Sequence, residues 1–267
     1  MPAAKSAKTS RRAAAPRPRK QPAAAAQRER ASAAPLETSK TRVGQILAIL
    51  AKTYPGAICA LTHQNAWQLL VATILSAQCT DQRVNLVTPG LFAKYPKPSD
   101  LAALTPEQLE PEIRSAGFYR NKERSIVGAA QMIAGEYGGQ VPPTMEELTR
   151  LPGVARKTAN VVLGTWFHLP VGVVVDTHVQ RVSRRLGLTR ELAPEKIEAD
   201  LMRLLPREEW INFAHRVIWH GRQLCLARGP RCKTCPLEKI CHAPDKTWSS
   251  QAPAAAKNKR ARAGRKR

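Results

Sequence analysis

Four cysteines near the C-terminus have the spacing of a metal-ligand array. Six, two and five residues separate them, in a segment rich in arginine, glycine and proline: Cys225, Cys232, Cys235 and Cys241. Disulfide bonds are one alternative, but they fit poorly with the cytoplasmic address that we expect below. Four thiolates suit a tetrahedral zinc ion as well as a [4Fe–4S] cluster, so the spacing alone leaves the two metals open.

A short turn at residues 151–155 is a candidate phosphate-binding site. It reads Leu-Pro-Gly-Val-Ala and lies between a short capped helical segment and a second helical run. A tight turn with glycine leaves backbone N–H groups free at a helix N-terminus, where an anion binds favourably. We therefore expect a helix-hairpin-helix at about 144–164, with Gly153, Val154 and Ala155 in contact with phosphate. An ordinary connection between helices is the alternative.

Two groups suited to acid–base chemistry follow this turn. Lys157 lies at the start of the second helix beside Arg156, where the helix dipole and a neighbouring cation both disfavour its ammonium form. A neutral amine is a usable nucleophile, although a lysine that only contacts phosphate is the simpler interpretation. Asp176 ends an apolar run nineteen residues later. It could cap a helix that begins near His178, pair with an arginine, or steer protons while the amine attacks.

The elements that must position these groups are helices. Apolar residues recur at helical spacing in two early segments, 43–50 and 67–75. Residues 105–108 read Thr-Pro-Glu-Gln, which predicts a capping box with proline at the first helical position, and Thr144 begins a similar pattern. We expect an all-α fold, and the absence of a fixed-period repeat argues against a solenoid.

The charge distribution indicates a polyanionic partner. The 267 residues carry 43 lysines and arginines against 20 acidic residues, and 43% hydrophobic residues are enough for a core. Residues 1–37 and 249–267 are rich in Ala, Pro, Lys and Arg, and we expect disordered basic tails that add phosphate contacts or only solubilise the chain. No stretch reaches the roughly 20 apolar residues of a membrane span, so we expect no membrane partner and a cytoplasmic, nucleoid-associated protein.

Over residues 40–245 the sequence resembles the endonuclease III family of helix-hairpin-helix DNA glycosylases. Four signatures carry the resemblance, in this order: Leu75-Ser76-Ala77-Gln78-Cys79-Thr80-Asp81, the hairpin with Lys157-Thr158-Ala159-Asn160, Val175-Asp176-Thr177-His178, and His220-Gly221-Arg222 before the four cysteines. The resemblance implies two lobes with a DNA-binding cleft between them. One is a six-helix module at 59–169, and the other is an iron–sulfur cluster domain formed by 38–58 and 170–248.

The resemblance also implies the chemistry. A damaged base is flipped out of the DNA stack, Lys157 attacks the sugar C1′ to form a Schiff base, and β-elimination cuts the strand, with Asp176 assisting. Oxidised pyrimidines in double-stranded DNA, and abasic sites, would be the substrates. A monomer is the simplest assembly.

The remaining site residues follow from position in the family pattern. Gln78 would fill the hole left by the flipped base, and Phe118 would wedge against the partner base, unless Phe118 is an ordinary core aromatic. Asp81 and His178 are further expected DNA contacts. In this family the four cysteines hold a [4Fe–4S] cluster, which resolves the choice of metal, and the intervening loop carries basic residues toward DNA.

Two departures from the family pattern concern geometry. Ala155 stands where a second glycine is commonest, and the interval from Lys157 to Asp176 is one residue longer than in the best-known members. A mismatch adenine glycosylase is one alternative function, but it would lack Lys157 and would carry a glutamate near Ala72. Another glycosylase of the superfamily and a non-catalytic DNA-binding protein are the others.

Overall fold

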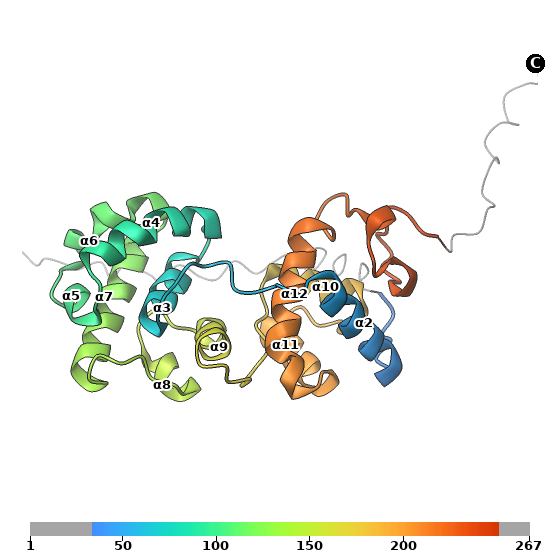
Figure 1. The fold of residues 1–267 in the computed structure, drawn as a ribbon, viewed down its shortest axis with the longest axis horizontal. Helices are drawn as coiled ribbons and strands as arrows, with labels where there is room; N and C mark the ends of the chain where they lie inside the picture. The colour runs from blue at the N-terminus through green and yellow to red at the C-terminus, as the bar shows by residue number, and fades with distance from the viewer. Residues whose placement is uncertain (1–33, 251–267) are drawn as a thin grey trace, which may run out of the picture.

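The chain folds as two helical lobes lying side by side, as the computed structural model shows for residues 34–250 (Figure 1). Within that range the secondary structure is eleven α-helices and four short 3-10 helices, without a strand, so the expected all-α fold is confirmed. The expectation of disordered tails concerns segments that lie outside the described residues, except for 34–37 and 249–250. No helix among the described residues is long and apolar enough to cross a membrane.

The first lobe contains the helices at the left of Figure 1. They are α3 (Ala66–Leu75), α4 (Asp81–Lys94), α5 (Pro98–Ala102), α6 (Pro106–Ile113), the 3-10 helix η1 (Arg114–Ala116), α7 (Tyr119–Glu136), α8 (Met145–Arg150) and α9 (Arg156–Thr165). The expected six-helix module thus holds seven α-helical segments, of which α5 has only five residues.

The second lobe joins the N-terminal helix to the C-terminal part of the chain. It contains α2 (Lys40–Thr53), α10 (Thr177–Arg185), α11 (Pro194–Leu204), η2 (Arg207–Glu209), α12 (Trp210–Gln223), η3 (Cys232–Thr234) and η4 (Glu238–Ile240). The buried Arg42 of α2 donates to the carbonyl oxygens of Leu186 and Ile240, each at 2.7 Å. These bonds fasten the first helix to segments far away in the sequence.

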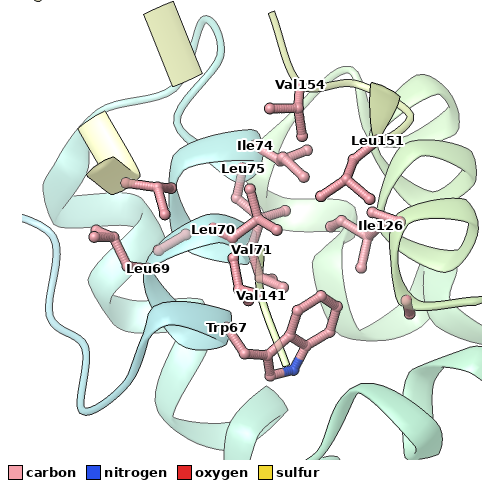
Figure 2. Packing of buried hydrophobic residues seen from close by; sticks show 14 of the residues in the cluster. Trp67, Leu69, Leu70, Val71, Ile74, Leu75, Ile126, Val141, Leu151 and Val154 are labelled. Atoms are coloured by element: carbon pink, nitrogen blue, oxygen red, sulfur yellow. The ribbon is translucent and has the colours of Figure 1, made fainter. Parts of the chain in front are cut away.

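Each lobe has its own hydrophobic core. The core of the first lobe includes buried residues from Leu61 to Leu163 and is arranged around α3, whose side chains are buried on nearly every face (Figure 2). A helix that is apolar all round belongs inside a domain. The second core combines residues 43–54 with 173–237. We therefore propose the domain boundaries 58/59 and 169/170, which fall in the two intervals between these cores.

The two helix starts that the sequence pattern predicts are both present. Thr105 accepts a hydrogen bond from the backbone N–H of Gln108, whose side chain accepts from the N–H of Thr105. This is the reciprocal capping box. Thr144 accepts from the N–H of Glu147 in the same way, but its hydroxyl donates to the Glu147 carboxylate. This second cap begins α8, the first helix of the expected helix-hairpin-helix.

Candidate functional site

A cavity of about 260 Å³ is lined by both lobes. Lys157, near the start of α9, and Asp176, just before α10, both line it. Further lining comes from the segment between α3 and α4, from the first residue of α4 and from α12: Ser76, Cys79, Asp81, His215, Trp219 and Arg222. Folding thus brings the two candidate reacting groups, which lie on different lobes, to one cavity, called here the interlobe cavity.

The hairpin that leads to Lys157 depends on Gly153. Its φ of +76° lies in the left-handed region, and a Cβ there would come within 2.4 Å of the Ser125 Cβ. Only glycine combines this conformation with so close an approach. Val154 is buried and anchors the turn in the core of the first lobe, while Gly153 and Ala155 are exposed. The turn therefore presents backbone, and little side chain, to solvent.

The N-terminus of α9 has no side-chain cap. Ala155 occupies the N-cap position in an extended conformation, and it has no side-chain atom that could accept from the first-turn N–H groups. Orphan N–H groups at a helix start carry partial positive charge and suit a phosphate oxygen. The uncapped helix start supports the expected contact of Gly153, Val154 and Ala155 with phosphate, which stays a prediction.

Arg156 turns away from Lys157 toward the other lobe. Its guanidinium donates to both carboxylate oxygens of Glu198 on α11, at 2.8 and 3.0 Å, and Glu198 also accepts from Asn160 at 2.8 Å. The hydrogen bonds that Arg156 donates to Glu198 raise the pKa of Arg156. Glu198 is buried, and it neutralises the cation that we expected to act on Lys157. No local pattern indicates this pairing, because the two residues are 42 positions apart.

The side chain of Lys157 is exposed, and no described residue shares a hydrogen bond with it. Asp176 has fixed surroundings, because its Oδ1 accepts from the backbone N–H groups of His178 and Val179, both at 2.8 Å. Asp176 is therefore the N-cap of α10, one of the three roles expected from the sequence. Its Oδ2 accepts no hydrogen bond from the described residues and remains available for chemistry.

His178 lines the same cavity and is held as a neutral ring. Arg181 lies 3.2 Å from its Nδ1 and also donates to the Gly221 carbonyl at 2.9 Å. An arginine can only donate, so Nδ1 accepts and the ring proton lies on Nε2. Burial lowers the pKa of His178, and Arg181 and Arg222 lower it further, while Asp176 opposes them. His178 thus presents an N–H donor near Asp176.

Asp81, an expected DNA contact, forms an ion pair with Arg222. Its Oδ2 accepts from the Arg222 guanidinium at 2.5 Å, which joins the start of α4 to α12. Sequence reasoning identified both residues within signatures but did not pair them, because 141 positions separate them. The pair lies in the lining of the interlobe cavity and connects the two lobes there.

Gln78 and Phe118 share an uncommon backbone conformation. Their φ angles are 54° and 49°, in the left-handed region that non-glycine residues rarely adopt. Phe118 is 69% exposed, so the alternative of an ordinary core aromatic is wrong. Gln78 is exposed as well. Strained conformations of this kind persist where the surrounding structure enforces them, and they cluster at functional sites.

The four cysteines line a second cavity, in the second lobe, together with Arg185 and apolar side chains. Burial and the neighbouring thiols raise the pKa of Cys235 to about 12. Four thiolates this close repel one another, and a bound metal would offset that repulsion. No three Cys, His or acidic side chains within residues 34–250 form a site for a single ion. The four thiols around one cavity are nevertheless a ligand set for a metal centre, and their chemistry suits zinc or an iron–sulfur cluster.

Comparison with known proteins gives concordant results. Residues 71–207 match the family model of the HhH-GPD superfamily base excision DNA repair proteins. The chain is 54% identical over 206 residues to endonuclease III of Synechocystis sp., covering 77% of this chain and 94% of the relative. It is 49% identical over 189 residues to endonuclease III of Bacillus subtilis, covering 70% and 86% respectively.

Solved structures give the same result. A trapped covalent intermediate of an endonuclease III with DNA superposes with a TM-score of 0.74 at 46% identity, covering 78% of this chain and 97% of that one. A non-covalent complex of endonuclease III with DNA also has a TM-score of 0.74, at 47% identity and the same coverage. A thermostable thymine-DNA glycosylase, at 19% identity and a TM-score of 0.69, shares the fold.

Proposed function

The chain belongs to the endonuclease III family of the HhH-GPD superfamily, and from this premise we propose that it is a bifunctional DNA glycosylase and abasic-site lyase of base excision repair. The observation that carries the proposal is the meeting of Lys157 and Asp176 at one cavity between the lobes. A non-catalytic DNA-binding protein would have no use for this pair. A mismatch adenine glycosylase would lack the lysine, and Ala72 is buried inside α3.

The reaction proceeds through a covalent amine intermediate. The neutral Nζ of Lys157 attacks C1′ of the flipped nucleotide, the bond from C1′ to the base breaks, and the base leaves with the bonding electrons and takes up a proton. The sugar ring opens to a Schiff base between C1′ and Nζ. Removal of a C2′ proton then expels the 3′ phosphate by β-elimination. Hydrolysis of the Schiff base returns the lysine.

Asp176 assists these steps from a fixed position. With Oδ1 held by two backbone N–H groups, Oδ2 can accept the proton that Lys157 must lose and can stabilise positive charge that develops on the sugar. The carboxylate needs no rearrangement for this. The neutral His178, with a donor on Nε2, is suited to a phosphate or sugar oxygen nearby.

DNA is bound through the backbone of the hairpin and through inserted side chains. The uncapped start of α9 holds a phosphate, with Gly153, Val154 and Ala155 supplying the contact. Gln78 enters the hole left by the flipped base, and Phe118 wedges against the orphaned partner. Their exposure and left-handed backbone support this assignment. We further propose oxidised pyrimidines as substrates, a monomeric enzyme, and a location with the nucleoid DNA.

We propose that Cys225, Cys232, Cys235 and Cys241 hold a [4Fe–4S] cluster. Arg185, which donates to the Cys225 Sγ at 3.3 Å, supports a charged thiolate at that position. When bound, the cluster would supply structural cross-links between the segment that follows α12 and residues 232–241. Purified protein should contain iron and acid-labile sulfide in equal amounts, and zinc in their place would contradict the assignment.

The proposed function is tested by a strand-cleavage assay with borohydride. The substrates are a duplex with one thymine glycol, an undamaged duplex and a duplex with an A·G mismatch. We expect cleavage and a trapped enzyme–DNA adduct on the oxidised duplex alone, and no adduct with Lys157→Gln. Adenine release without trapping would indicate the mismatch class. Binding without cleavage would indicate a non-catalytic DNA-binding protein.

A further inference from the structure

A buried lysine lies beneath the two insertion residues. Lys122, in the first turns of α7, is only 5% exposed. Its Nζ donates to the carbonyl oxygen of Leu75 at 2.8 Å and to that of Ala116 at 3.0 Å. No acidic side chain among the described residues pairs with it. Burial lowers the pKa of Lys122, which agrees with an ammonium group that is satisfied only by backbone carbonyls.

The two acceptors lie in different segments, and each comes just before an insertion residue. Leu75 is the last residue of α3, and three positions later Gln78 adopts a φ of 54°. Ala116 ends η1, and two positions later Phe118 adopts a φ of 49°. Both carbonyls belong to helix ends, where orphan oxygen atoms need a donor. One ammonium group thus binds the two helix ends from which the loops begin.

A lysine at this place does more than fill space. An ammonium group loses several kcal/mol of hydration on burial, whereas a methionine of similar length would lose none. Leu75 and Ala116 are themselves buried, so packing alone already holds the cores of these segments. What the ammonium group adds is a directional bond to each carbonyl, and hence a defined spacing between the two loops.

We propose that Lys122 is a positioning residue that holds the loops 76–78 and 116–118 at one spacing, so that Gln78 and Phe118 enter the duplex together. The inference rests on the proposed function, because insertion has meaning only in an enzyme that flips a base. Lys122 itself is not among the residues that line the interlobe cavity. Its effect should therefore appear where a base pair must be opened, and not in the chemistry at the sugar.

The test is Lys122→Met in the full-length, cluster-loaded protein, with two substrates. One is a duplex with thymine glycol, which must be flipped, and the other is a single-stranded oligonucleotide with an abasic site, which offers no pair to open. We expect base release from the duplex to fall on the order of ten- to a hundredfold, as for the loss of two charge-assisted hydrogen bonds. Cleavage of the single strand should be unchanged.

A fluorescent base analogue opposite the lesion reports insertion directly, and its signal on binding should fall in the variant. Phe118→Ala should give the same pattern on both substrates. Lys94→Met is the matched control, since it removes one lysine charge from the surface of the same lobe, and it should change neither activity. Lys122→Gln keeps donors without charge and should recover part of the duplex activity.

The outcomes separate the inference from the function. A wild-type enzyme that fails to release thymine glycol but shows the fluorescence change would overturn the proposed function and not the role of Lys122. Equal losses on the duplex and the single strand in both Lys122 variants would make the residue a support of the fold and overturn the inference. Unchanged duplex activity in Lys122→Met would overturn it as well.

Discussion

The two walls of the interlobe cavity hold their reacting groups in different ways. On the first lobe, Lys157 has a free side chain on a tightly held backbone, since Gly153 packs on Ser125 and Arg156 is clamped by Glu198. On the second lobe, the side chain of Asp176 is itself fixed, as the cap of α10. The difference suits the proposed chemistry, in which a nucleophile must travel to the sugar carbon, whereas a group that steers protons works best already in place.

The walls are also joined at two places by ion pairs that cross between the lobes. Glu198 of the second lobe holds Arg156 of the first, and Arg222 of the second holds Asp81 of the first. The two arginine side chains are similarly exposed, at 47% for Arg156 and 41% for Arg222, but the Glu198 side chain is 7% exposed against 23% for Asp81. Because Glu198 is the more buried carboxylate and also accepts from Asn160, we expect the Glu198 clamp to set the relation of the two walls.

The largest effect on turnover should come from substitution of Asp176, whose side chain is held in place. Asp176→Asn keeps an oxygen for the cap but removes the negative charge, so turnover should fall about 10²- to 10⁴-fold, while affinity for abasic duplex DNA is kept. Single-turnover cleavage and a binding titration measure the two. Asp176→Ala should show the same loss of turnover and also a loss of about 1 kcal/mol in the free energy of unfolding. Proportional losses of affinity and turnover in Asp176→Asn would make the residue purely structural.

A smaller effect, on DNA affinity, is expected from the backbone of the hairpin that precedes Lys157. Gly153→Ala places a Cβ against Ser125 at a φ of +76°, so the hairpin must shift. Affinity for an abasic duplex should fall on the order of tenfold, the equivalent of about 1.4 kcal/mol, which lies within the usual strain of such a residue. Gly138→Ala is the control, because Gly138 has a similar φ of +58° but open space around it. Equal losses of DNA affinity in both variants would show that the loss does not arise from the hairpin.

The ion pair between Arg156 and Glu198 should contribute mainly to the free energy of unfolding. Glu198→Gln keeps the size of the side chain but leaves Arg156 and Asn160 with a neutral partner. The free energy of unfolding should drop by about 1–3 kcal/mol, and turnover should fall less than in Asp176→Asn. Denaturant titration measures the first. Glu191→Gln, which removes an exposed pair with Lys196 at 4.0 Å, should leave both unchanged. A wild-type stability in Glu198→Gln would mean that the clamp does not hold α9.

The smallest effect concerns pH. Burial, with Arg181 and Arg222, lowers the pKa of His178 in the folded protein below its usual 6.5, so the unfolded chain takes up a proton first as the pH falls. Stability is therefore lost on acidification below about pH 6.5 and is unaffected by this group above it. Unfolding at pH 7.5 and 5.5 should show a smaller loss for His178→Gln than for the wild type. An equal loss would place the titrating group elsewhere.

Local patterns in the sequence predicted the parts of the site that local physics determines. The threonine caps, the left-handed backbone of Gly153 and the capping role of Asp176 depend on neighbours within a few positions, and the four cysteines lie in one short segment. A cap or a tight turn is a matter of backbone angles and the nearest side chain, so residue types carry the information. The family signatures then supplied the fold and the class of reaction.

Only the tertiary structure decided which distant groups meet. Arg156 faces Glu198, not Lys157; Asp81 is paired with Arg222; and Lys122 binds two carbonyls that lie before the insertion residues. These contacts join positions that are 42, 141 and 47 residues apart, and none belongs to a repeating pattern. These contacts depend on how the helices pack against one another. A charged side chain binds the polar groups that this packing brings within about 3 Å of it.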